Sequence, residues 1–159
     1  MKRFPFLLPL LLLLALPLRA ADLEPSQVDT LLEPYFQLQK ALAADKLEAG
    51  RRAAASLVKT AEGIDHSAVE EIARKAQEIV DATRFKEARQ AFEPLSEEMI
   101  RLVKMPGTSS EKEVYLMFCP MAMGGMGAEW LQNDKKLVNP YYGAEMLHCG
   151  VVKGNVAER

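Results

Sequence analysis

Sulfur-bearing side chains gather in the last third of the chain. They are Met117, Cys119, Met121, Met123 and Met126 within ten residues, and then Met146 and Cys149. In an extended segment, residues two apart share a face, so the first four could present their sulfur atoms on one side. Thioethers and thiolates are soft ligands that favour Cu(I) or Ag(I) over hard cations such as calcium or magnesium. The sequence therefore predicts a soft-metal site in this region.

The two cysteines also permit an interpretation without a metal. In an exported protein, an even pair of cysteines commonly forms a disulfide. A bridge between Cys119 and Cys149 would close a loop of about thirty residues and contribute about 3–4 kcal/mol in a chain-entropy estimate. The methionines would then be flexible filler of the core. Both interpretations stay open, and the two can coexist in a redox-dependent site.

Few other residues suggest chemistry. His148 is next to Cys149 and could be a borderline ligand, but a lone exposed histidine is the simpler expectation. His66 precedes the third expected helix, where a solvated surface role suffices. The segment Gly124–Gly127 lacks the Lys and Ser/Thr of a phosphate-binding loop, and the chain has no C-x-x-C pair. We therefore expect a protein that is not an enzyme.

The N-terminus has the three parts of a secretory signal peptide. Lys2 and Arg3 form a positive start, residues 4–18 are almost wholly apolar, and Ala20 and Ala21 are small residues suited to cleavage. The apolar run is shorter than the ~20 residues that a membrane-spanning helix needs. We expect residues 1–20 to be a signal peptide that is cut after Ala20 or Ala21. The mature protein is then expected in the periplasm, without a membrane span.

The charge of the remaining chain argues against some classes of partner. Removal of residues 1–20 leaves 17 basic and 22 acidic residues, a net charge of −5. Because these charges are scattered, we expect neither nucleic acid nor an anionic membrane as a partner. The remaining 139 residues suit a single domain, which can build its core without a metal or a disulfide.

Residues 22–105 carry apolar residues at helical spacing and predict four helices. Ser26 and Asp45 are the expected N-caps of the first two helices, and Ser67 with Glu70 forms a capping box for the third. The fourth helix has the clearest apolar seam, which consists of Phe85, Ala88, Phe92, Leu95, Met99 and Leu102. Short connections favour antiparallel neighbours, so we expect a mainly helical protein with an up-and-down four-helix bundle.

Residues 108–153 differ in composition and predict a small, irregular, Cys/Met-rich lobe packed on the bundle. Residues 114–118 are sufficiently β-branched and aromatic for a strand, and residues 146–152 could form a second one, which would make a short β-ribbon. Residues 123–127 indicate a glycine-rich turn, and residues 128–131 indicate a helical turn.

Four segments of the lobe together resemble a known family. They are Cys119-Pro120-Met121, Gly127-Ala128-Glu129-Trp130-Leu131-Gln132, Asn139-Pro140-Tyr141-Tyr142-Gly143 and Met146-Leu147-His148-Cys149-Gly150. With Ala88-Arg89-Gln90-Ala91-Phe92 ahead of them, the pattern is similar to a bacterial periplasmic domain family of unknown function. That family occurs alone or fused to adaptor subunits of copper/silver efflux systems of the CusB type. The resemblance covers roughly residues 30–152.

The resemblance implies a periplasmic helical domain associated with soft-metal handling. The metal role carries over to four positions, which are Cys119, Met121, Met146 and Cys149. The implied cargo is Cu(I) or Ag(I), and the implied partners are components of a heavy-metal efflux system. Our hypothesis is therefore a periplasmic soft-metal binding protein of heavy-metal efflux or homeostasis. The alternative is an exported helical interaction module with a structural Cys119–Cys149 disulfide and no metal.

Overall fold

The computed structural model describes residues 22–109 and 113–157, so the predicted signal peptide lies outside the described residues. The chain begins with four long helices, α1 (Pro25–Ala43), α2 (Leu47–Ala61), α3 (Ser67–Asp81) and α4 (Phe85–Lys104). These are followed by β1 (Tyr115–Cys119), α5 (Ala122–Gly125), β2 (Ala128–Gln132), the 3-10 helix η1 (Gly143–Met146) and β3 (Val151–Asn155). The protein is therefore mainly helical, with a small three-stranded antiparallel sheet after the helices.

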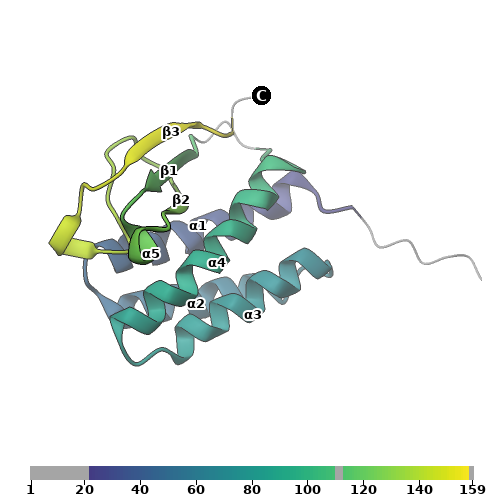
Figure 1. The fold of residues 1–159 in the computed structure, drawn as a ribbon. Coiled ribbons are helices and arrows are strands. Elements are labelled where there is room, and N and C mark those ends of the chain that lie inside the picture. Colours follow the sequence, from purple (N-terminus) through teal and green to yellow (C-terminus); the bar gives the residue numbers. More distant parts are fainter. Residues whose placement is uncertain (1–21, 110–112, 158–159) are drawn as a thin grey trace, which may run out of the picture.

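The four long helices form a helical bundle, as the apolar seams predicted. The seam of α4 is fully buried at Phe92, Leu95 and Met99. Each helix packs on the next one along the chain, and α1 also contacts α4. Figure 1 shows the sheet on the side of α1 and α4, with α2 and α3 on the other side of the bundle. None of the helices in the described part of the chain is long and apolar enough to cross a membrane.

The predicted starts of the first two helices are wrong. α1 begins after Glu24 rather than at Ser26, because Glu24 and Gln27 form a capping box that satisfies the first backbone N–H groups. α2 follows Lys46 instead of being capped by Asp45. The Asp45 carboxylate binds other partners, which are described below.

The start of α3 gives His66 a role that we did not predict. Its Nδ1 atom accepts a hydrogen bond of 3.2 Å from the backbone N–H of Ala68, so His66 is the N-cap. The predicted capping box of Ser67 and Glu70 is therefore wrong by one residue. We expected only a solvated surface role for His66, but its half-buried imidazole also provides the cap that a serine was expected to provide.

The three strands lie in the order β2-β1-β3, with β1 paired antiparallel to both neighbours. The predicted strand at residues 114–118 is confirmed as β1. Residues 128–131 were predicted to form a helical turn and instead form most of β2. The reason is tertiary, because Trp130 lies opposite Met117 and both side chains are fully buried. The predicted strand at residues 146–152 starts later than expected, at the beginning of β3.

Two tyrosine hydroxyls bind the outer edge of β2, one from α1 of the bundle and one from the loop before η1. The backbone N–H of Leu131 donates to the Tyr35 hydroxyl at 3.1 Å, and the Tyr141 hydroxyl donates to the carbonyl of Glu129 at 2.8 Å. Edge strands otherwise leave such backbone groups unpaired. The rings of Tyr35 and Tyr141 also contact Phe92 of α4, at centroid distances of 5.5 and 5.7 Å. The lobe is thus fixed on α1 and α4 by hydrogen bonds and aromatic packing.

Candidate functional site

The two cysteines meet at the end of the sheet. Cys119 is the last residue of β1, Cys149 lies two residues before β3, and their Sγ atoms are 3.4 Å apart. The Cys119 side chain is fully buried, whereas Cys149 is half-buried. Both residues are free thiols, so the structure has no disulfide bond between them. Cys119 and Cys149 therefore lie together, as both the metal and the disulfide interpretations of the sequence required.

The sheet register and a glycine bring the thiols together. Phe118 lies opposite Val151, which aligns the end of β1 with the start of β3. Gly150, which joins Cys149 to Val151, has a φ of +137°. A Cβ atom there would lie only 2.7 Å from the carbonyl oxygen of Phe118. Glycine therefore allows the chain to pass this closely. As a result, Cys149 lies beside Cys119.

The buried Asn139 holds the segment that carries Cys149. Its Nδ2 donates to the Cys149 carbonyl at 2.8 Å, and its backbone N–H donates to the Leu147 carbonyl at 2.7 Å. Its Oδ1 accepts a hydrogen bond of 2.8 Å from the backbone N–H of Tyr141. Because Asn139 has no exposed surface, these bonds are protected from water. The Asn-Pro-Tyr-Tyr-Gly segment therefore holds Cys149 in place through Asn139.

The thiol of Cys149 favours its protonated form. Hydrogen bonding with the Cys119 sulfur raises the pKa of this thiol above its ordinary value, and burial raises it further. Metal ligation requires the thiolate. A metal ion that binds here must therefore displace a proton.

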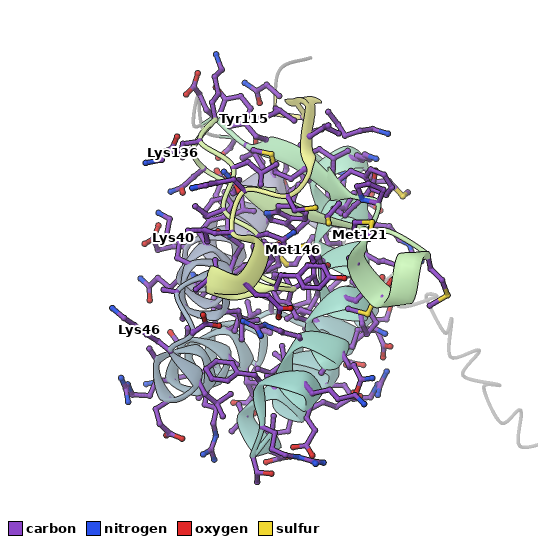
Figure 2. The ribbon with its side chains drawn as sticks, turned by 60° about the vertical axis from the view of Figure 1, so that its left-hand side comes forward. Lys40, Lys46, Tyr115, Met121, Lys136 and Met146 are labelled. Atoms are coloured by element: carbon purple, nitrogen blue, oxygen red, sulfur yellow. The ribbon has the colours of Figure 1, made fainter. Side chains whose placement is uncertain are left out.

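Met121 and Met146 lie on the two segments that carry the cysteines. Met146 ends η1, and its carbonyl accepts a hydrogen bond of 3.0 Å from the backbone N–H of Cys149. Met121 follows Cys119 by two residues and is 52% exposed. The Tyr142 hydroxyl donates to the Met121 carbonyl at 2.5 Å and thereby ties the two segments together. Figure 2 labels both methionines on the lobe, Met121 near α5 and Met146 near η1.

The predicted stripe of four sulfur atoms along one strand is wrong. Met117 and Cys119 share a face of β1, and Met117 is fully buried in the core. The chain leaves the strand at Pro120 and turns into α5, where Met123 adopts left-handed backbone angles (φ 51°, ψ 43°). Met121 and Met123 therefore no longer follow the alternation of the strand.

No group of three or more His, Cys, Asp and Glu side chains within the described ranges could hold a metal ion. His148 is exposed, and its Nδ1 lies 2.7 Å from the carbonyl oxygen of Leu137. A metal bound at the thiol pair would therefore rest mainly on sulfur ligands, which suit a soft ion.

An ion pair that the sequence analysis missed joins the helices to the lobe. Arg89 of α4 forms a salt bridge with Asp45 and also donates from Nε to the carbonyl of Pro140 at 3.0 Å. The other carboxylate oxygen of Asp45 accepts a hydrogen bond of 2.9 Å from the backbone N–H of Ala144. Gly143 leaves room for the pair, since a Cβ atom there would lie 2.1 Å from Asp45 Oδ1. We call this arrangement the Asp45–Arg89 latch.

The latch should make part of the protein's stability depend on pH. The hydrogen bond from Ala144 has the largest effect and lowers the pKa of the Asp45 carboxyl, burial partly opposes it, and Arg89 lowers the pKa further. A lowered pKa stabilises the fold above the ordinary value of about 3.9, and this stabilisation is lost as pH falls through the folded pKa. We expect Asp45→Asn to cost about 1 kcal/mol at pH 7, because the pair is partly exposed, and progressively less as the pH falls through the folded pKa of Asp45.

Urea unfolding of the unsubstituted protein and of Asp45→Asn at several pH values measures this difference in the free energy of unfolding. Asparagine is a suitable replacement because it tolerates the positive φ of residue 45, which is 54°. The other carboxyl groups are the same in both proteins, so their titration cancels in the comparison. A gap in the free energy of unfolding that stays constant from pH 7 to pH 2 would contradict a role for the carboxylate charge.

The helical part of the chain identifies its family. Residues 31–111 match a family described as "Protein of unknown function (DUF3347)" and make up about half of the 159 residues. The chain belongs to this family. The matched region contains Asp45 and Arg89 and ends before β1, so it includes neither cysteine. No curated protein and no solved structure matches the chain significantly. The chemistry of the lobe must therefore be argued from this chain's own residues.

Proposed function

We propose that this family member is a periplasmic protein that binds soft monovalent metal ions, Cu(I) or Ag(I), in heavy-metal efflux or homeostasis. The observation that carries the proposal is the 3.4 Å separation of the Cys119 and Cys149 sulfur atoms, which come from positions 30 residues apart. These two thiolates are the proposed principal ligands, with Met121 and Met146 assisting. The role is binding rather than catalysis, and the partners are components of an efflux system.

The geometry of the thiol pair supports a shared ion. A metal–sulfur bond of about 2.3 Å allows two sulfur ligands of one ion to lie up to about 4.6 Å apart. The observed 3.4 Å is within this limit, so one ion could contact both sulfur atoms after small side-chain rotations. Hard cations need several oxygen ligands, and the described residues offer no cluster of acidic side chains for them. The ligand set therefore favours a soft ion.

Titration of the reduced protein with Cu(I) in competition with a chelator tests this proposal. We expect one tightly held ion per chain. Because the raised pKa of Cys149 makes protons strong competitors, the affinity should fall as pH is lowered, by about tenfold per pH unit for each proton displaced. Ag(I) provides a matched titration without copper redox chemistry. Failure of the reduced protein to bind either ion, or an affinity that does not change with pH, would contradict the thiolate assignment.

The same sulfur contact favours a second candidate from a different class. A disulfide needs an S–S distance of about 2.05 Å, so the two sulfur atoms would have to approach by about 1.4 Å. The protein would then be an exported helical interaction module whose lobe is pinned by a bridge, with no metal. A thiol count on protein isolated from the periplasm separates the two candidates. The absence of free thiols, with mass and melting temperature unchanged by added metal, would favour the module.

Two further features belong to this proposal. Cleavage after Ala20 or Ala21 would deliver the protein to the periplasm, and N-terminal sequencing of periplasmic material tests this directly. We also propose that the four helices run up and down, since the connections at residues 44–46, 62–66 and 82–84 are only three to five residues long.

A further inference from the structure

A second group of sulfur atoms lies beside the thiol pair. The turn between β1 and β2 carries Met121, Met123 and Met126, and the first and last of these are 52% and 84% exposed. Met123 and Met126 line one open groove of about 490 Å³ between this turn and α4, where Tyr142 also lines it. We propose that this groove is a separate thioether site for Ag(I) or Cu(I), with Met123 and Met126 as its sulfur ligands.

Packing accounts in part for Met123, which is half-buried against the core, but not for Met126, which is 84% exposed. Exposed apolar side chains lose the stabilisation that burial provides, and clusters of methionine at a surface are typical of binding sites. Met123 also keeps a left-handed backbone conformation, which costs energy for a residue with a side chain. Met123 and Met126 both line the groove. A metal ion bound to the sulfur atoms would explain both the exposure of Met126 and the left-handed backbone of Met123.

The charges around the groove favour a monovalent ion. Lys86 and Glu145 line it with opposite charges, and the third charged lining residue, Arg89, is already paired with Asp45. The groove therefore offers little negative charge, and thioethers are neutral. A doubly charged cation would lose more hydration than such a site can replace, whereas a soft monovalent ion needs less compensation and prefers sulfur.

This site can be tested independently of the thiol pair. We would label the methionine methyl groups with ¹³C in the Cys119→Ser/Cys149→Ser variant and follow their NMR signals during titration with silver nitrate. The signals of Met123 and Met126 should shift together and reach saturation. The signal of Met99, which is fully buried, should not change. Unchanged signals of Met123 and Met126 would overturn the proposal.

Met105 provides the matched control for unselective binding to an exposed thioether. It is 79% exposed and lines a different cleft, whose other described lining residues carry no sulfur, so its signal should need roughly tenfold more silver. Met123→Leu/Met126→Leu should abolish the early response, and Met105→Leu should leave it intact. A Met105 response at the same silver concentration would overturn the proposal.

A second measurement covers the case in which the thiol-free variant does not fold. In the unsubstituted protein the thiol pair takes the first equivalent of Ag(I), and Met123 and Met126 should respond to the second. A methionine response in the absence of any thiol binding would reject the proposed function and retain the groove. Thiol binding without a methionine response would reject the groove alone.

Discussion

Replacing Cys149 by serine should weaken Cu(I) binding by about a hundredfold or more, because a neutral, hard hydroxyl replaces one of the two thiolates. Cys119→Ser should cause a similar loss, since the two sulfur atoms lie 3.4 Å apart and would share one ion. Met121→Leu and Met146→Leu should cause smaller losses, because each removes only an assisting neutral ligand. Competition titrations of the reduced variants at one fixed pH measure these differences.

Cys149→Ser is the more decisive of the two thiol variants. Cys119 is fully buried, so a serine hydroxyl there could destabilise the fold for lack of a hydrogen-bond partner. Cys149 is half-buried and its replacement can be hydrated more easily. Met105→Leu, which removes a sulfur atom from another cleft, is the control and should bind as the unsubstituted protein does. Equal affinities of Cys149→Ser and the unsubstituted protein would remove Cys149 from the ligand set.

The helices were predictable because their signal is local and periodic. The seam through Phe92, Leu95 and Met99 specifies one buried face at 3.6-residue spacing, and the structure buries these residues completely. β2 was not predictable in this way. Four of its five residues favour a helix by their own propensity, and they become a strand because Trp130 pairs with Met117 inside the core. The predicted N-cap of α3 was wrong because the side chain of the neighbouring His66, and not that of Ser67, accepts the hydrogen bond from the first turn.

The geometry of the candidate site was only partly predictable from the sequence. The sequence indicated that Cys119 and Cys149 could meet, and the sheet register brings them together. It gave no sign of the latch, because Asp45 and Arg89 are 44 residues apart. Asp45 was predicted as a helix cap because a sequence pattern reveals only those partners that are close along the chain. The backbone N–H that it actually binds, on Ala144, is 99 residues away.

The thiol pair and the latch are connected through one loop of the lobe. Asn139 holds the carbonyl of Cys149, and the neighbouring Pro140 accepts the hydrogen bond of Arg89. The segment that positions the half-buried thiol is therefore anchored to the bundle on which the family match rests. The bundle thereby holds the loop that contacts Cys149.

Replacing Gly150 by alanine should separate the two thiols. The new Cβ atom would lie 2.7 Å from the carbonyl oxygen of Phe118, and a backbone oxygen cannot move aside as a flexible side chain can. The start of β3 must then shift away from β1 and take Cys149 with it. We expect formation of the Cys119–Cys149 disulfide, with oxidised glutathione as the oxidant, to slow by about tenfold or more because the bridge tolerates little change in geometry. Cu(I) affinity should fall in parallel.

Gly154→Ala is the matched control for the backbone cost of this substitution. Gly154 also has a positive φ, +151°, but a Cβ atom there would meet nothing within 4 Å. Alanine at either position should cost about 1–3 kcal/mol through backbone strain, and only Gly150→Ala should also slow disulfide formation. Mass spectrometry of the oxidised proteins follows the loss of the two thiol hydrogens. If both variants form the bridge at the rate of the unsubstituted protein, the close passage at Phe118 does not position Cys149, and another contact, such as that with Asn139, must do so.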